Sequence, residues 1–279
     1  MKNVIREKYN LIPKSQKRLA DYFLENIDAI PFLNIYQIAE ATQYSVASIV
    51  RFAQKLGFQG FSDFKSKITQ SYKDSLKNQE IFHPLKIDKV KEHTLVMVAN
   101  QDIKNINDTL NLIDTKTFDN VVDLILSSKR VYTMGLGISF LLSQILAYQL
   151  NQVGVDSYYF RSNSTSFFDQ ILFLNKDDLL IGFSFPPYSV ETVEAAKFAK
   201  ERKIRVISIT NKSSSPITFQ CVYSLIVKSE NMLFTNSFSA ISVIINALAT
   251  ECAKKDRNRA EKFLKEFKYI TENFNQVLI

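Results

Sequence analysis

Several residue types are scarce in this chain of 279 residues, which has no tryptophan, two cysteines and two histidines. Cys221 and Cys252 lie far apart and match neither a Cys-x-x-Cys nor a Cys/His spacing. This pattern excludes a disulfide framework and a zinc-finger arrangement. We therefore expect both thiols to be reduced, and we expect neither a metal site nor a cofactor.

Long apolar runs are also absent. The longest, 240–249, is interrupted by Ser242 and Asn246 and is too short to span a bilayer. The first residues contain no apolar segment of the signal-peptide type. We therefore expect a cytoplasmic protein that has no membrane partner.

The overall composition is that of a folded protein with real hydrophobic cores. Apolar residues make up 46% of the chain and charged residues 23%, which excludes global disorder. The length allows one small and one average domain. We predict a helical domain at 1–77, a connecting segment that includes some helix at 78–105, and an α/β domain at 106–279.

Positive charge is concentrated in the first domain. Residues 1–77 carry 12 Lys and Arg against 7 Asp and Glu, a balance of +5 within the total of +7. Residues 106–250 carry 12 against 12. Such an excess is typical of a protein that binds a polyanion, although a solvated basic surface is the simpler alternative.

The most informative segment, 35–61, reads IYQIAEATQYSVASIVRFAQKLGFQGF. It predicts two helices joined by a short polar turn, which is the pattern of a helix-turn-helix. In the second helix Ile49, Phe52, Ala53 and Leu56 form the apolar stripe. The opposite stripe is small, polar and cationic, and we predict that it contacts DNA bases and phosphates together with the capping serine: Ser45, Ala47, Ser48, Arg51 and Lys55. An ordinary helical hairpin with a solvated face is the alternative.

After the connecting segment, short β-branched or aromatic runs alternate with helical segments. We predict strands at 130–134, 155–160, 179–183, 204–210 and 222–227. Apolar runs separated by helices indicate a doubly wound α/β fold with a parallel five-stranded sheet. A ligand of such a fold binds beyond the carboxyl ends of the strands.

Three loops at those strand ends are candidates for ligand binding. We predict effector-binding residues in all three: Gly135, Gly137 and Ser139 in the first, Ser162 and Asn163 in the second, and Ser184, Tyr188 and Ser189 in the third. Glycines and helix-starting amides attract anions, and hydroxyls bind polar ligands. Each loop also has a simpler explanation when it is taken alone. The first would contain ordinary turn glycines, the second would be a plain polar loop, and in the third Ser189 would only cap a helix. Together at one sheet edge they favour a site.

These motifs carry a family resemblance. SVASIVRFAQKLGFQGF resembles the helix-turn-helix of the RpiR/MurR family of bacterial transcription regulators. GLGIS, DLLIGFS, SVETVEAAKFAKERKIRVISIT and SSSPI resemble the SIS (sugar isomerase) domain of that family, in the same order. The resemblance implies a double-stranded DNA operator, a sugar, amino-sugar or sugar-phosphate effector, and a homodimer or tetramer. Repressors are commoner than activators in this family, so the resemblance implies a repressor of a carbohydrate-metabolism operon.

The same resemblance assigns roles to individual residues. Ser139 would donate its hydroxyl, Ser184 and Ser189 would occupy the outer positions of a Ser-x-Ser-Gly-x-Thr phosphate loop, and Glu191 would take the acidic position that follows. This chain departs from the loop at Pro186 and Pro187, which remove a hydroxyl and two backbone N–H donors. The effector is thus an unphosphorylated or acid sugar, or its phosphate is held by Ser139 and the loop that begins at Arg161.

Two alternative functions remain open. SIS domains also serve aldose–ketose isomerases, which need an acid and a base. His83 and His93 both fall in the connecting segment. Glu191 or Glu194 could serve as the base, but each is explained more simply as an acidic residue in the first turns of a helix, where it interacts favourably with the helix dipole. We therefore expect no enzyme and no catalytic residue. The other alternative is a sugar-binding scaffold whose basic domain binds something other than DNA.

Overall fold

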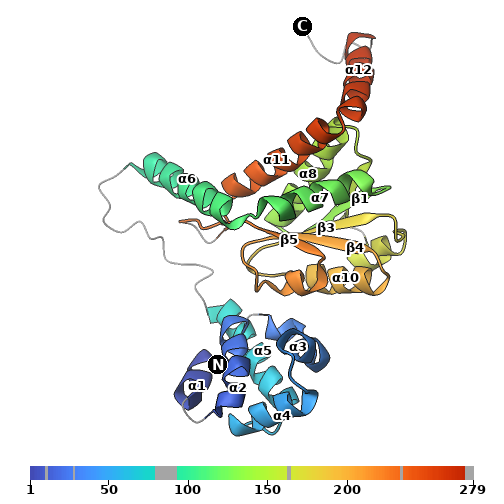
Figure 1. Cartoon of the computed structure of the whole chain (residues 1–279). Coiled ribbons are helices and arrows are strands. Elements are labelled where there is room, and N and C mark those ends of the chain that lie inside the picture. Colours follow the sequence, from blue (N-terminus) through green and yellow to red (C-terminus); the bar gives the residue numbers. More distant parts are fainter. Residues whose placement is uncertain (10–11, 28, 79–92, 162–164, 233–234, 274–279) are drawn as a thin grey trace. The chain divides into compact units, whose positions relative to one another are not determined.

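A computed structural model describes the chain at 1–9, 12–27, 29–78, 93–161, 165–232 and 235–273. The described residues form two compact units (Figure 1). Apart from residues 214–216, which are assigned to the first unit, the first precedes the segment 79–92 and the second follows it. Each unit has a core of its own, and each is described by itself.

The first unit is helical. Its helices are α1 (Lys2–Lys8), α2 (Lys14–Glu25), α3 (Ile35–Thr42), α4 (Val46–Lys55) and α5 (Phe61–Asn78), with a 3-10 turn at Ile30–Phe32. This helical content confirms the class expected for the amino-terminal part of the chain.

Three phenylalanine rings form the centre of this unit and join α2, α4 and α5. The Phe23 ring stacks on Phe52 with 5.3 Å between ring centroids, and Phe64 meets Phe23 edge-on at 5.2 Å. All three side chains are fully buried. Burying each contributes about 1.5–3 kcal/mol. The apolar face of α4 is therefore held firmly against the unit.

The ends of α3 and α4 are specified by local chemistry. Asn34 caps α3 in a capping box with Gln37, and Ser45 caps α4 by accepting from the N–H of Ser48. Gly57 follows α4 at φ +93°, a left-handed conformation that favours glycine. At the same end, the Lys8 ammonium donates to the Leu56 carbonyl at 2.9 Å. The predicted helix-turn-helix is confirmed.

The second unit alternates strands and helices. Its strands are β1 (Val131–Met134), β2 (Ser157–Tyr159), β3 (Leu179–Ser184), β4 (Arg205–Thr210) and β5 (Tyr223–Ile226). Its helices are α6 (Thr94–Leu112), α7 (Thr115–Ser127), α8 (Ile138–Gln152), α9 (Phe167–Ile171), α10 (Val190–Glu201), α11 (Ser239–Lys255) and α12 (Arg257–Asn273), with a 3-10 turn at Pro216–Gln220.

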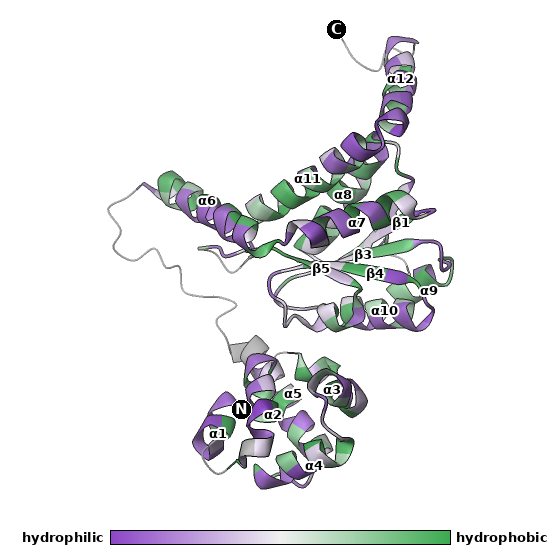
Figure 2. Cartoon of the chain, viewed as in Figure 1, coloured by the Kyte–Doolittle hydropathy of each residue, from purple (hydrophilic) through white to green (hydrophobic). Residues whose placement is uncertain are grey.

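Within the described residues the strands form one parallel sheet in the order β2-β1-β3-β4-β5. The predicted doubly wound, five-stranded fold is confirmed. In Figure 1, α7, α8 and α11 lie on one side of the sheet and α10 on the other. Every residue of β3 is buried, and Figure 2 shows that β3 and α11 are apolar over most of their length. This two-sided burial explains why the strand sequences are continuous apolar runs.

Helix α6 begins inside the segment predicted as a connection. It is attached to the second unit by polar contacts: Asp102 accepts from the hydroxyls of Ser237 and Ser239, both at 2.6 Å. The buried Asn105 amide donates to the Glu230 carbonyl at 2.7 Å. The last part of 78–105 is thus a helix of the second unit, and 79–92 lies outside the described residues. The domain limits stay a prediction.

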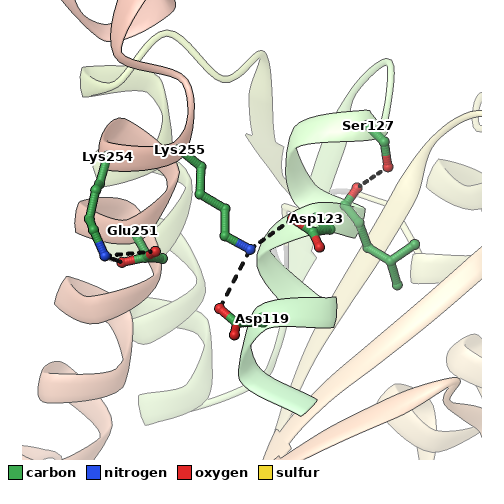
Figure 3. A network of polar contacts seen from close by, with 7 residues as sticks. Asp119, Asp123, Ser127, Glu251, Lys254 and Lys255 are labelled. Carbon is green, nitrogen blue, oxygen red and sulfur yellow. Dashed lines mark hydrogen bonds and ion pairs between the residues drawn. The ribbon is translucent and has the colours of Figure 1, made fainter. Parts of the chain in front are cut away.

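Helices α7 and α11 are joined at their surface by an ion-pair network. In Figure 3 the Lys255 ammonium points between two carboxylates of α7, at 2.9 Å from Asp123 and 3.5 Å from Asp119. The hydrogen bond with Asp123 is the main cause that raises the pKa of Lys255. Such exposed pairs orient neighbouring helices and stabilise the fold weakly.

Both cysteines are free thiols in the structure. Burial raises the pKa of the Cys221 and Cys252 thiols to about 12, so both are protonated near neutral pH. Among the described residues, no helix combines the length and the apolar character that crossing a bilayer requires.

Candidate DNA-binding face and ligand crevice

The exposed face of α4 carries the residues predicted to contact DNA. Ser45, Ala47, Arg51 and Lys55 are exposed and Ser48 is half-buried, whereas Ile49, Phe52 and Ala53 on the other face are buried. The hydroxyls of Ser45 and Ser48 lie 2.9 Å apart at the amino end of the helix. The structure therefore brings these residues to one surface, with small polar groups at the start and cations further along.

Not every cation of this unit is free to reach a partner. The Lys65 ammonium donates to the Leu33 carbonyl at 2.6 Å, and Lys8 is bound at the end of α4. These two lysines contribute charge, but their side chains have structural contacts. The exposed stripe of α4 is therefore the better candidate for direct readout.

The loop between β1 and α8 holds the first group of predicted effector residues. A Cβ atom at Gly135 would lie 2.5 Å from the Ser139 carbonyl oxygen, so only glycine permits this close approach. Gly137 precedes α8 at φ +60°, where the absence of a side chain also matters. Ser139 is buried in the first turn of α8. The two glycines thus place Ser139 directly beyond the end of β1.

The loop after β3 holds the third group. Ser184 is the last residue of β3, and Ser189 caps α10 by accepting from the N–H of Thr192 at 3.2 Å. The Ser189 side chain therefore has the cap role that the sequence allowed. Ser184 and Thr192 are buried, at 3% and 1% exposure.

These two loops enclose a hollow that is open to solvent. It contains roughly 190 Å³ including its open side, and it is lined by Leu136, Ser139, Phe183, Ser184, Phe185, Pro187, Ser189 and Thr192. The loops follow β1 and β3, the neighbouring strands at which the strand order β2-β1-β3 reverses direction. This reversal is the position at which ligands bind to open α/β sheets. The predicted residues Ser139, Ser184 and Ser189 meet here.

Two further predicted residues have contacts of their own. The Tyr188 side chain is buried, and its hydroxyl donates to Asn211 at 2.7 Å. The Glu191 carboxylate accepts from the backbone N–H of Phe167 at 3.2 Å and so connects α10 with α9. Neither residue lines the hollow.

The second predicted loop is only partly described. Ser162 and Asn163 lie outside the described residues. Arg161, before them, is exposed, and its N–H donates to the Gln170 side chain at 2.7 Å.

Thr192 is the residue that the sequence analysis missed. Its hydroxyl oxygen and that of Ser184 are buried, and neither has a hydrogen-bond partner in the part of the chain that the structure describes. Buried hydroxyls without partners are rare, because each costs about 1–3 kcal/mol of desolvation. The two residues that carry these hydroxyls both line the hollow.

Family models match both units. The model of the helix-turn-helix domain, rpiR family, matches residues 1–75, and that of the SIS domain matches residues 124–251. The matched ranges contain α4 and the hollow, respectively.

Individual proteins are also similar to this chain. An uncharacterised HTH-type transcriptional regulator of Haemophilus influenzae is 28% identical over 229 residues, 80% of this chain and 78% of that protein. The sugar isomerase domain of an RpiR transcription factor from Sphaerobacter thermophilus is 26% identical with a TM-score of 0.62, covering 64% of this chain and 99% of that one. The NanR protein of Vibrio vulnificus, solved with ManNAc-6P, is 22% identical with a TM-score of 0.60, covering 97% and 98%.

Proposed function

This chain belongs to the RpiR family of transcription regulators, and on that basis we propose that it represses a carbohydrate-metabolism operon under the control of a sugar-derived effector. The observation that carries the proposal is the exposed stripe of α4, in which Arg51 and Lys55 project from a helix whose other face is buried. A recognition helix needs one face packed against its own domain and the opposite face exposed to the DNA groove.

The SIS unit supplies the effector site of the proposal. Ser139, Ser184 and Ser189 line one hollow at the point where the strand order reverses. NanR, which shares this fold, was solved with ManNAc-6P, so sugars, amino sugars and their phosphates form the first group of ligands to test. Its identity of 22% supports the fold alone.

Binding of a palindromic operator requires two copies of the helix-turn-helix unit, and we propose a homodimer or a tetramer. Helix α8 carries apolar side chains at helical spacing that are exposed in the single chain: Ile138, Leu141, Ile145 and Tyr148. An unpaired apolar stripe of this kind supports contact with a second copy of the chain. Two recognition helices would then lie about 34 Å apart, or a multiple of that distance.

We propose further that the SIS unit binds its ligand without converting it, in a cytoplasmic protein without a resident cofactor. Both histidines precede the first strand. Glu191, a candidate base, is hydrogen bonded to the Phe167 N–H. An assay of sugar-phosphate interconversion tests this point, and turnover that disappears in Glu191→Gln would contradict it.

A gel-shift titration with the fragment upstream of its own gene tests the proposed function. We expect a discrete complex that an excess of unrelated DNA does not displace and that dissociates when the effector is added. A protein that binds sugars but no DNA fragment specifically would instead be the sugar-binding scaffold considered above.

A further inference from the structure

The hollow at the end of β1 and β3 contains two polar atoms whose hydrogen-bonding capacity is unused. Ser184 Oγ and Thr192 Oγ1 are buried without a partner among the described residues. Each hydroxyl can donate one hydrogen bond and accept two. Both residues line the same opening, so a ligand that enters it lies next to the two side chains that carry these hydroxyls.

Four of the backbone positions around this opening offer no free N–H to a phosphate. Pro186 and Pro187 have no N–H. The N–H of Thr192 donates to the Ser189 hydroxyl, and the N–H of Ser139 donates to the Leu136 carbonyl at 3.1 Å. A phosphate nest needs several such groups pointing at the anion.

Charge at the hollow also disfavours a phosphate. Among the residues that the structure describes, its lining consists of three apolar side chains, one proline and four hydroxyl residues, and includes no lysine or arginine. A phosphate dianion that left water for this surface would lose its hydration without gaining a charge-assisted hydrogen bond.

We propose that the hollow selects a neutral polyhydroxyl ligand, an unphosphorylated sugar or sugar alcohol, over its phosphate ester. The inference rests on the proposed effector site and names its ligand class. Neighbouring ligand hydroxyls would bind Ser184 and Thr192, since hydroxyl pairs can donate and accept in both directions. The C–H face of the ligand would pack on Phe183, Phe185 and Leu136.

The test uses matched pairs of ligands with the full-length protein. Thermal shift followed by calorimetry compares each hexose, N-acetylhexosamine and hexitol with its own 6-phosphate, and inorganic phosphate serves as an anion control. We expect at least one neutral member to bind at least tenfold more tightly than its ester. If an ester binds more tightly through the same residues, the ligand class is wrong and the effector site stands. If no member binds, both are contradicted.

Thr192→Val separates a ligand-binding role from a structural one. Valine has a similar shape but no hydroxyl, so it removes the unpartnered oxygen. We expect the melting temperature of the ligand-free protein to stay the same or rise, and the affinity for the neutral ligand to fall tenfold or more.

Ser184→Ala serves as a second variant with the same expectation. A fall in the ligand-free melting temperature with unchanged ligand affinity, in both variants, would overturn the proposal. That result would show that the two hydroxyls stabilise the fold.

Discussion

Single polar side chains in this chain act in two different surroundings. Arg51 and Lys55 project into water from α4, where a long cationic side chain is well hydrated and free to reach a groove. Ser184 and Thr192 are buried, and their hydroxyls have no hydrogen-bond partner among the described residues. Loss of an exposed cation therefore changes binding with little effect on stability, whereas loss of an unpartnered buried hydroxyl removes a ligand contact without destabilising the ligand-free protein.

Arg51→Ala should weaken specific operator binding by about 1–3 kcal/mol, because the exposed guanidinium is placed to bond a base or phosphate. The unfolding midpoint should not change, since the side chain is exposed. Fluorescence anisotropy with a labelled operator measures the affinity. Arg6→Ala, an exposed arginine of α1, makes the same change in net charge and should have a smaller effect. Equal losses in both variants would mean that only the charge of the unit matters.

Local periodicity identified most elements of the fold. The strands β3 and β4 lie within one residue of their predicted limits, because strands covered on both faces must be continuous apolar runs. The α4 faces were also correct, since Ile49 and Phe52 recur at helical spacing. Both signals are local in sequence.

Elements that depend on distant polar contacts were not predictable in the same way. Helix α6 lies partly in the predicted connection. Its place in the second unit depends on Asp102 and Asn105, whose hydrogen-bond partners lie more than 120 residues away in sequence. Thr192 was missed because periodicity does not indicate which residues meet at the edge of the sheet. Its importance depends on the end of β3, which brings Ser184 into the same hollow. Hydrophobic patterning contains no information about such pairings.

The start of α7 gives a prediction about pH. Asp114 caps this helix by accepting from the N–H and then the hydroxyl of Thr117, both at 2.9 Å. These bonds lower the pKa of its carboxyl below the ordinary 3.8. The folded state therefore gains stability from the carboxylate at pH values above 3.8, and this gain is lost as the pH falls through the native pKa.

Asp114→Asn keeps an acceptor at the cap but cannot titrate. Urea unfolding of both proteins between pH 7 and pH 3 should show wild type more stable at neutral pH and the difference shrinking below about pH 4. A difference that is constant over this range would show that the Asp114 charge does not contribute.

At the scale of the whole molecule, the reading of a palindromic operator requires two copies of the chain. The apolar stripe of α8 defined above is the proposed contact, with Ile145 at its middle and 45% exposed. Without a dimer, one helix-turn-helix unit would read only one half-site, and specificity would be low.

Ile145→Arg places a charge in this stripe and should convert the protein to a monomer. Light scattering should show its mass falling from a multiple of 32.1 kDa to that value, and operator affinity should fall with it. Val222→Arg is the matched control, because Val222 is an exposed apolar residue outside α8. A wild-type protein that is already monomeric, or an Ile145 variant of unchanged mass, would contradict the proposed interface.

The central claim is that the exposed stripe of α4 reads DNA sequence, and selection from a random duplex library tests it most directly. Full-length wild type should enrich a motif of two inverted half-sites, with centres about 10 base pairs or a multiple of that apart. Arg51→Ala, selected in parallel, should lose preference at one position in each half-site. No enriched motif with wild type, or the same motif enriched equally by the variant, would contradict the account.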